Sequence, residues 1–348
     1  PYTLAIVAVV AVLTAFVAAT TALAQYDIKK VLAYSTVSQL GFMFMAAAAG
    51  AFWAAIFHVV THAFFKACLF LGAGSVIHGC HHEQDMRKMG GLAKLMPVTF
   101  ATYAISTLAI AGIFPFAGYQ SKHAVLAALK GIDNVYLNGM ISILFYLATI
   151  TAFLTAFYMT RSVAMTFFGK YRGHAHPHES PWPMTLPLII LAAFATFGGV
   201  WLEGTLPHYL ANVIPHAASH HHESIFESIV NSWLGLLGVV LAILVYTKFE
   251  SFADFAKQIF NPVFKLFSGK WFFDEIYSSA IVRPLEGIAG ILWKFFDQGI
   301  VDGAVNASAS VVDFKGEVLR RIQTGQTRQY AFFMFLSTVL LIAFCFLI

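Results

Sequence analysis

Two histidines and a lysine follow one another at four-residue intervals, at positions 58, 62 and 66, inside an otherwise apolar run. In an α-helix this spacing places both imidazoles and the ammonium group on one face. Imidazole titrates at about pH 6.5, and a lysine removed from water can exchange its proton near neutral pH. With bridging water, His58, Thr61, His62 and Lys66 therefore predict a proton relay.

Other interpretations of these residues stay open. A histidine within a membrane is often a hydrogen-bonded packing residue, and polar side chains can simply hold a structural scaffold together. Two histidines four residues apart could also bind a metal ion or a haem. Lys66 on the same face disfavours such binding, because a cation beside a metal raises the electrostatic cost. Proton transfer is the favoured interpretation.

A second group of residues surrounds a predicted helix break. Pro115 removes a backbone donor, and Gly112 and Gly118 permit irregular backbone. A helix break at membrane depth is tolerated only where it is buried in protein or lines a water-filled cavity, and in transporters such breaks mark ion sites. Lys122 follows the break and is a second candidate proton carrier. The alternative is a proline kink that ends a span, with Lys122 at the membrane interface.

Five polar side chains lie together early in another apolar run. They could supply hydroxyl groups to a water chain beside His58, or they could join neighbouring helices through hydrogen bonds. These residues are Tyr34, Ser35, Thr36, Ser38 and Gln39.

Three histidine-rich stretches, His78–Glu83, His174–Glu179 and His220–Glu223, lie in predicted loops. They lack cysteine partners at zinc spacing, so polar interface loops are favoured over metal sites. The sequence also has no dinucleotide-binding glycine fingerprint, no iron–sulfur cysteine motif and no nucleophile elbow. We therefore expect no metal, no cofactor and no redox chemistry within this chain.

The composition of the chain indicates an integral membrane protein. It has 348 residues, 59% hydrophobic and 11% charged, and its mean hydropathy is +0.74, whereas soluble domains are about 25% charged. The scattered net charge of +4 excludes a nucleic-acid footprint. Cys68, Cys80 and Cys345 lie in or beside apolar runs and are expected to be small core residues, not a disulfide framework.

Apolar windows predict about eight membrane spans, because about 20 helical residues cross a bilayer. Continuous apolar runs favour helices over a β-barrel, so the predicted fold class is an all-α, polytopic membrane helix bundle. The windows are Pro1–Ala24, Val31–Cys80 (two spans broken near Gly50), Leu95–Ser121, Val135–Thr160, Met184–Leu202, Ser228–Thr247 and Tyr330–Ile348.

The connecting segments suggest an orientation. Asp27–Lys30, His81–Lys94 and Arg161–Arg172 carry basic residues, and basic loops face the cytoplasm or matrix. The chain begins with proline and lacks the features of a signal peptide. We therefore expect it to be part of a longer chain.

Beyond residue 249 the pattern changes. Trp271–Gln323 carries mixed charge, and its apolar positions recur at steps of three and four, as in an amphipathic helix that Pro284 and Gly303 would kink. An ordinary interfacial helix and a tether to neighbouring subunits both fit. The expected organisation is a transmembrane bundle over 1–249, a lateral amphipathic helix over 250–328 and a terminal span over 329–348.

The motifs resemble a known family. The run DIKKVLAYSTVSQLG from Asp27 to Gly41, then Phe57-His58 and THAFFK from Thr61 to Lys66, is similar to the antiporter-like membrane subunits of respiratory NADH:quinone oxidoreductase, complex I. The runs HHEQD from His81 and MGGL from Met89, Ser121-Lys122 and the RIQTG run from Arg321 resemble the largest, distal subunits. These also resemble subunits of multi-subunit sodium/proton antiporters.

The resemblance implies roles for individual residues. Lys66 matches the lysine that holds and releases the pumped proton, His58 and His62 match the bridging histidines, and Lys122 matches the lysine of the broken helix. The family usually has an acidic residue where this chain has His123. The family's first inverted repeat, with its Glu–Lys pair, has no counterpart here.

The expected function is proton translocation coupled to quinone reduction in other subunits, which would hold the flavin, the iron–sulfur clusters and the quinone. The expected partners are the lipid bilayer and the neighbouring membrane-arm subunits, contacted through the lateral helix. The expected location is an energy-transducing membrane, the bacterial inner membrane more than the mitochondrial one. The alternative is a subunit of a multi-subunit cation/proton antiporter.

Overall fold

The computed structural model describes residues 2–132, 139–174, 176–211, 213–214 and 225–347. Regular structure in these ranges is helical, with one isolated β-bridge between Asp27 and Asp85. The predicted all-α class is confirmed. The chain divides into two compact units, Pro1–Phe272 and Phe273–Ile348.

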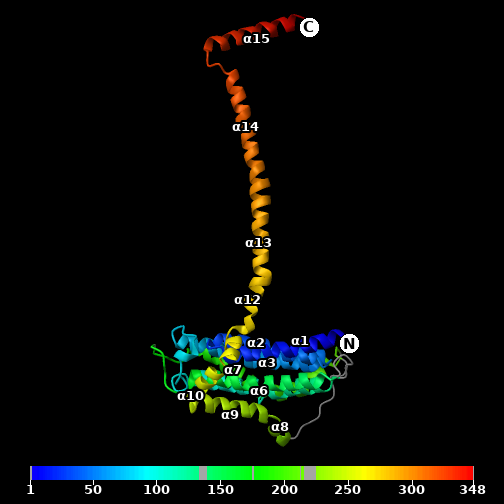
Figure 1. Cartoon of the computed structure of the whole chain (residues 1–348), viewed down its shortest axis with the longest axis vertical. Coiled ribbons are helices and arrows are strands. Elements are labelled where there is room, and N and C mark those ends of the chain that lie inside the picture. The colour runs from blue at the N-terminus through cyan, green and yellow to red at the C-terminus, as the bar shows by residue number, and fades with distance from the viewer. Residues whose placement is uncertain (1, 133–138, 175, 212, 215–224, 348) are drawn as a thin grey trace. The chain divides into compact units, whose positions relative to one another are not determined.

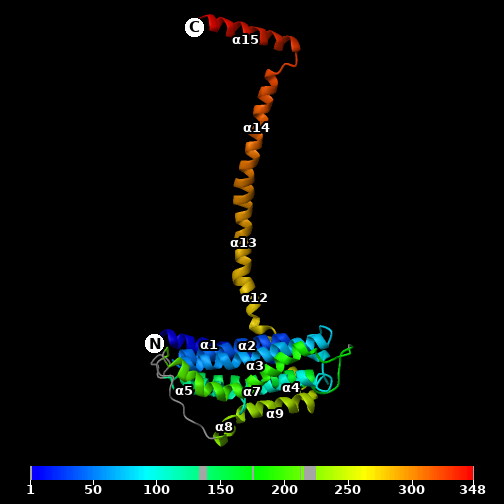
Figure 2. The same ribbon diagram turned by 180° about the vertical axis from the view of Figure 1, so that it is seen from behind.

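The first unit is a helix bundle whose long helices run side by side in both views (Figures 1 and 2). Its elements are α1 (Tyr2–Ala24), α2 (Ile28–Ala48), α3 (Phe52–Gly79), the 3-10 helix η1 (Met86–Lys88), α4 (Pro97–Ala111), α5 (Ala117–Lys130), α6 (Ile141–Phe167), α7 (Trp182–Leu210), α8 (Ile225–Asn231) and α9 (Trp233–Thr247).

Six helices of the described chain, five of them in the first unit, are long and apolar enough to cross a membrane: α1, α2, α3, α6, α7 and α15 (Thr327–Leu347). α4 and α9 are apolar but have 15 residues each. The eight predicted windows thus correspond to six full-length candidates and two shorter helices. The window Leu95–Ser121 is divided, because its second part belongs to α5.

Small residues let α1 and α2 pack closely. Ala8, Ala15 and Ala19 of α1 are fully buried, and a Cβ atom added to Gly41 of α2 would lie 2.8 Å from the Ala11 carbonyl oxygen. Such contacts between small side chains are the usual means of helix association in membranes, where the hydrophobic effect does not drive it. This packing fixes α2 in the interior of the bundle.

A short bridge joins two loops at one end of the bundle. The Ile28 amide donates to the Gln84 carbonyl at 3.1 Å, and the Met86 amide donates to the Tyr26 carbonyl at 2.9 Å. Asp27 also caps α2 by accepting from the amides of the following two lysines. The α1–α2 turn is therefore held against the loop that follows α3.

The first unit ends with short amphipathic helices, α10 (Glu250–Ile259), α11 (Asn261–Ser268) and the 3-10 turn η3 (Lys270–Phe272). α11 and η3 pack on α1, where the Trp271 indole donates to the Thr20 hydroxyl at 3.1 Å.

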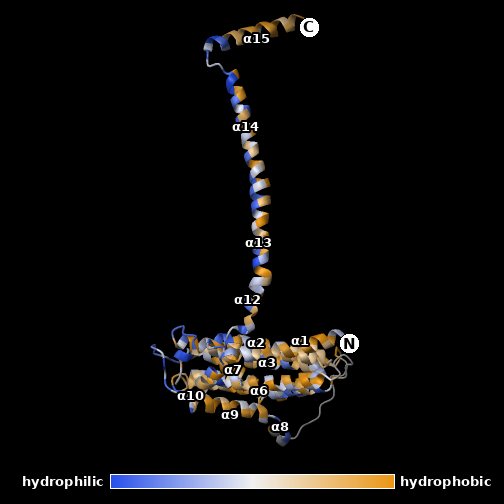
Figure 3. Ribbon diagram, viewed as in Figure 1, coloured by the Kyte–Doolittle hydropathy of each residue, from blue (hydrophilic) through white to orange (hydrophobic). Residues whose placement is uncertain are grey.

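The second unit is a run of helix followed by the terminal helix α15. α12 (Phe273–Tyr277), α13 (Arg283–Leu292) and α14 (Asp302–Ile322) are joined by π-helical stretches at Ser278–Val282 and Trp293–Val301. The helix continues through Pro284 and Gly303, and the irregularity predicted there takes the form of the π-helical turns just before them. Apolar and polar residues alternate along this run (Figure 3), and its described side chains are exposed except for the half-buried Ser278.

Candidate functional site

α3 carries the predicted relay into the bundle interior. Because α3 is continuous from Phe52 to Gly79, His58, His62 and Lys66 lie on one of its faces. His58 is 0% and Lys66 5% exposed, while His62 is half-buried. The two imidazole centroids are 6.2 Å apart, and the Phe65 ring meets the His62 ring edge-on at 5.4 Å. Lys66 thus faces protein and not lipid.

His58 is bonded on both sides of its ring. Its Nδ1 lies 3.0 Å from the Ser121 hydroxyl of α5, and its Nε2 lies 3.2 Å from the Gln39 side-chain oxygen of α2. The Thr61 hydroxyl donates to the same Ser121 hydroxyl at 2.8 Å. Polar side chains from α2, α3 and α5 therefore meet at one imidazole, which is the arrangement a proton relay between helices needs.

Lys66 has a neutral partner on α2. Its ammonium group donates to the Ser35 hydroxyl, and its Nζ lies 5.7 Å from the centre of the Phe70 ring. A buried ammonium bonded to a hydroxyl keeps its donors partly satisfied without a fixed counter-ion. Within the part of the chain that the structure describes, no carboxylate pairs with this ammonium group.

The predicted helix break is present between α4 and α5. Gly112 adopts the left-handed conformation (φ 77°), the Phe114–Pro115 peptide bond is cis, and α5 begins at Ala117. The amides of Gly112 and Ile113 turn back to the carbonyls of Ala109 and Leu108. This closing turn leaves the Ile110 carbonyl free to accept a bond from a side chain.

Lys122 uses that carbonyl. Its Nζ donates to the Ile110 oxygen at 2.7 Å and lies 5.5 Å from the centre of the Phe42 ring. The side chain is 4% exposed, so it does not extend to the membrane interface. The break thus supplies the polar group that lets a lysine stay buried. Since Ser121 precedes Lys122, the His58 contact and the second lysine lie on adjacent residues.

Gly118, which was predicted to belong to the helix break, lies in a helix. It lies inside the first turn of α5, not in the break, and a Cβ atom there would lie 1.9 Å from the Ala109 carbonyl oxygen. The physical requirement at this position is close approach of two helices, not irregular backbone.

The other polar residues predicted near the relay divide into two groups. Ser35 and Gln39 contact Lys66 and His58, as described. Ser38 donates to the Ala15 carbonyl of α1 at 3.0 Å, Thr36 bonds back to its own helix, and Tyr34 packs against the apolar core. Of these three, Ser38 joins neighbouring helices through a hydrogen bond, which was the open alternative.

His123, which replaces the acidic residue usual in the resembling family, stacks on Tyr119 with ring centroids 5.7 Å apart. Adjacent residues of a helix point in different directions. Lys122 is therefore held by its hydrogen bond to the Ile110 carbonyl and not by the residue that follows it in the sequence.

Arg161 was expected in a loop, and this expectation is wrong, because α6 continues to Phe167. Arg161 is 2% exposed. Its Nη1 donates to the Gln25 carbonyl at 2.7 Å and its Nε to the Tyr246 hydroxyl at 3.1 Å. The signal in the sequence was weak, since an arginine near the end of an apolar run is typical of a helix terminus.

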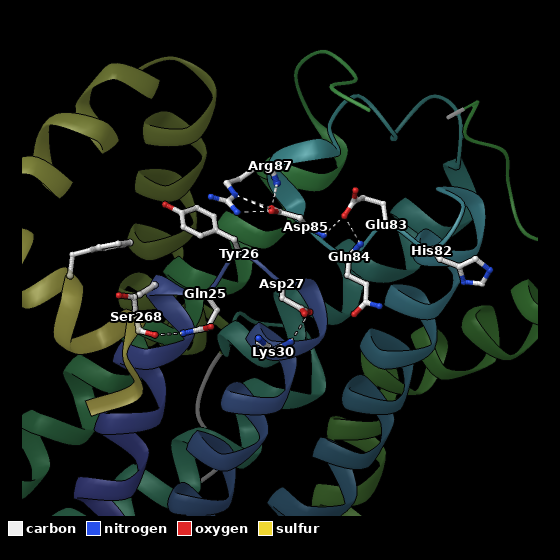
Figure 4. Close-up of a pocket in the computed structure, with 12 residues that line it drawn as sticks. Gln25, Tyr26, Asp27, Lys30, His82, Glu83, Gln84, Asp85, Arg87 and Ser268 are labelled. Carbon is white, nitrogen blue, oxygen red and sulfur yellow. Dashed lines mark hydrogen bonds and ion pairs between the residues drawn. The ribbon is translucent and has the colours of Figure 1, made fainter. Parts of the chain in front are cut away.

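A surface pocket of about 580 Å³ lies near Arg161, at the end of the bundle where α1 meets α2 (Figure 4). Asp85 accepts from the Arg87 guanidinium at 2.6 Å, which lowers the pKa of Asp85. The pKa of Glu83 is lowered chiefly by the Asp85 amide and also by Lys88. Gln25, Tyr26 and Arg87 are among the residues that line this pocket.

The histidine-rich loops act as contacts between loops. His178 meets His78 edge-on at 5.6 Å and His81 at 6.2 Å. Beside it, the Glu179 carboxylate accepts from the Val98 and Thr99 amides at 2.8 and 3.3 Å, capping α4 from a distant loop. In the residues that the structure covers, no three or more His, Cys, Asp or Glu side chains are placed so that they could hold a metal ion. The stretch His220–Glu223 lies outside the described residues.

A polytopic helix bundle with a broken helix and a buried row of imidazole and ammonium groups is typical of membrane transporters that carry ions or protons. Residues 2–155 match the family described as "NADH:quinone oxidoreductase/Mrp antiporter, TM". This segment of the chain belongs to that family, and the resemblance drawn from its motifs is confirmed.

Curated relatives match nearly the whole chain. It is 40% identical to NADH-quinone oxidoreductase subunit L of Mycobacterium tuberculosis, over 97% of this chain and 54% of the relative. It is 36% identical to subunit L of Rhodobacter capsulatus (95% and 57%). It is 38% identical to NAD(P)H-quinone oxidoreductase chain 5 of Picosynechococcus (92% and 53%). The chain therefore spans about half the length of these relatives.

A solved structure shares the fold. The structure titled "Structure of Mrp complex from Dietzia sp. DQ12-45-1b" superposes with a TM-score of 0.58 at 21% identity, over 97% of this chain and 33% of that one.

Proposed function

We propose that this chain moves protons across an energy-transducing membrane as a membrane-arm subunit of an NADH:quinone oxidoreductase. The observation that carries the proposal is the buried set formed by Lys66, His58 and Lys122, whose polar atoms bond only to neutral partners among the described residues. Intramembrane charged groups are costly, and where they occur they commonly form proton relays.

The proposed path runs along the bundle interior. A proton leaves Lys66, passes the imidazoles of His62 and His58, and reaches the Ser121 hydroxyl beside Lys122. The His58 ring suits this role because each nitrogen faces an oxygen on another helix, so it can accept on one side and donate on the other. The buried His62 Nε2 has no hydrogen-bond partner among the described residues, which leaves it available to a passing proton.

The remaining parts of the enzyme are proposed to lie in other subunits. They would hold the flavin, the iron–sulfur clusters and the quinone, and quinone reduction would change the hydration and charge state of the axis. Helices α12 to α14 expose Ile281, Leu285 and Ile288, and neighbouring membrane-arm subunits would cover this apolar stripe. The bacterial inner membrane is the proposed location.

The decisive experiment reconstitutes the assembled complex in vesicles and measures protons moved per electron. Lys66→Ala and Lys122→Ala should lower this stoichiometry, whereas Lys29→Ala, which removes an exposed lysine, should not. Unchanged stoichiometry in both buried-lysine variants would exclude the proposed carriers.

A second candidate function is cation/proton antiport without electron transfer, favoured by the family description and by the Mrp fold neighbour. It predicts sodium-dependent proton movement and purification without flavin or iron–sulfur subunits. Proton movement that requires NADH oxidation and is equal in sodium and choline media would exclude it.

A further inference from the structure

Arg161 is a buried charge that the relay does not use. Its guanidinium lies 5.0 Å from the centre of the Tyr26 ring and 5.5 Å from that of Tyr246. Its hydrogen bonds in the described chain go to a carbonyl and a phenol oxygen, on Gln25 and Tyr246. Arginine cannot lose its proton in a protein. The bundle therefore contains a permanent positive charge that no described carboxylate pairs with.

The position of this charge is specific. Toward the surface, its neighbours Gln25 and Tyr26 line the pocket of Figure 4. A second arginine, Arg87, also contacts Tyr26, with its guanidinium carbon 4.5 Å from the ring centre. The pocket itself is of mixed charge, with Asp27, Glu83 and Asp85 beside Lys30 and Arg87, and Arg161 lies behind its Gln25 and Tyr26 wall.

On the inner side, a polar route continues from Arg161 to the relay. Tyr158 lies one helical turn closer to the middle of α6, and its hydroxyl is buried within reach of Ser35 but has no well-formed hydrogen bond. Ser35 is the residue that accepts from Lys66. Arg161 is thus the charged residue between the pocket wall at Gln25 and the polar groups, Tyr158 and Ser35, that lead to Lys66.

A fixed charge at such a point repels protons. At a separation of about 10 Å and an effective dielectric constant of about 20, one positive charge disfavours another by roughly tenfold. Arginines in membrane channels exclude protons and cations by this means.

We propose that Arg161 is an electrostatic barrier that closes the Lys66 end of the relay to the surface pocket, so that protons exchange between Lys66 and Lys122 along the histidines and do not pass between Lys66 and the pocket through Tyr158. It is a positioning residue for proton flow, and the inference rests on the proposed function of the relay.

The test measures passive proton entry into vesicles that contain the assembled complex, driven by a potassium diffusion potential without NADH. Arg161→Gln should raise entry per complex by roughly tenfold. Tyr246→Phe removes one of the hydrogen bonds to Arg161 but keeps its charge, so it should leak like the wild type. Wild-type entry in Arg161→Gln, or equal leaks in both variants, would overturn the barrier.

Two further variants keep the test decisive. The leak of Arg161→Gln should be abolished when Lys66→Ala is added, and a leak that persists would mean that the protons bypass the relay. If Arg161→Gln does not assemble, Arg161→Lys replaces it, because a buried lysine can lose its charge where arginine cannot. Its leak should rise above wild type as the pH is raised and the lysine loses its charge, and a pH-independent leak at the wild-type value would refute the barrier.

The outcome is separable from the proposed function. Unchanged proton stoichiometry in Lys66→Ala during NADH oxidation would remove the relay, whatever Arg161 does. Lowered stoichiometry in Lys66→Ala together with a wild-type leak in Arg161→Gln would keep the relay and remove the barrier alone.

Discussion

Replacing Gly118 with alanine should separate the two halves of the broken helix. The added Cβ atom would lie 1.9 Å from the Ala109 carbonyl oxygen and 2.8 Å from its carbon. Ordinary contact begins at 3.4 Å, so α4 and α5 would have to move apart by about 1.5 Å at this point. Because the obstacle is backbone, no side-chain rotation can relieve the contact.

That displacement reaches the second lysine. Lys122 extends from α5 to the Ile110 carbonyl of α4 over 2.7 Å, and a separation of about 1.5 Å would take this bond beyond hydrogen-bonding distance. We expect Gly118→Ala to cost about 1–3 kcal/mol through overpacking and to lower the number of protons moved per electron. Electron transfer in an assembled complex should persist.

Gly131→Ala is the matched control. It makes the same change at the other end of α5, where φ is −85° and the nearest atoms lie at 3.5 Å, so it should leave both stability and stoichiometry unchanged. The assay pairs the melting temperature of the purified complex with proton counting in vesicles. Equal behaviour of the two glycine variants would show that the approach of α4 to α5 does not hold Lys122, and the reasoning would fail.

Other predictions concern the partners of charged groups. Ser35→Ala should lower proton stoichiometry, because it leaves the Lys66 ammonium without its hydroxyl at a cost of about 1–3 kcal/mol, while Ser35→Thr should retain it in the same proton-counting assay. Glu179→Gln should weaken the distant cap of α4 by about 1–2 kcal/mol, measured as faster amide exchange in the first turn of that helix. Arg87 lowers the pKa of Asp85, so the stabilisation by this pair should be complete above about pH 4 and lost as pH falls through the lowered pKa. Amide exchange of η1 should therefore rise at acidic pH, and Asp85→Asn should show that faster exchange already at neutral pH.

The relay on α3 could be predicted because helical periodicity alone fixes it. Residues four apart share a face in any α-helix, and the cost of burying Lys66 in lipid demands a protein environment for that face. Both inferences need only the sequence. The identity of the partners does not follow in this way, since Ser35, Gln39 and Ser121 come from helices whose rotation about their own axes is set by packing.

Gly118 and Arg161 show where the sequence is ambiguous. A glycine near a proline favours a break, yet only the distance to Ala109 reveals that Gly118 serves close packing. The sequence around an arginine six residues before the end of an apolar helix does not show whether its side chain extends to the membrane surface or turns into the bundle. The contact with the Gln25 carbonyl decides between the two, and it depends on the path of the α1–α2 turn.

The buried cationic side chains are stabilised in a similar way. In the described chain the fully buried cationic side chains are Lys66, Lys122 and Arg161, and no carboxylate is buried with them. Two of the three bond to backbone carbonyls that regular helix leaves free, on Ile110 at the break and on Gln25 in the α1–α2 turn. An irregular backbone can thus replace water as the ligand of a cation without adding a fixed negative charge. This matters for proton movement because a carboxylate would hold the proton that the relay has to release.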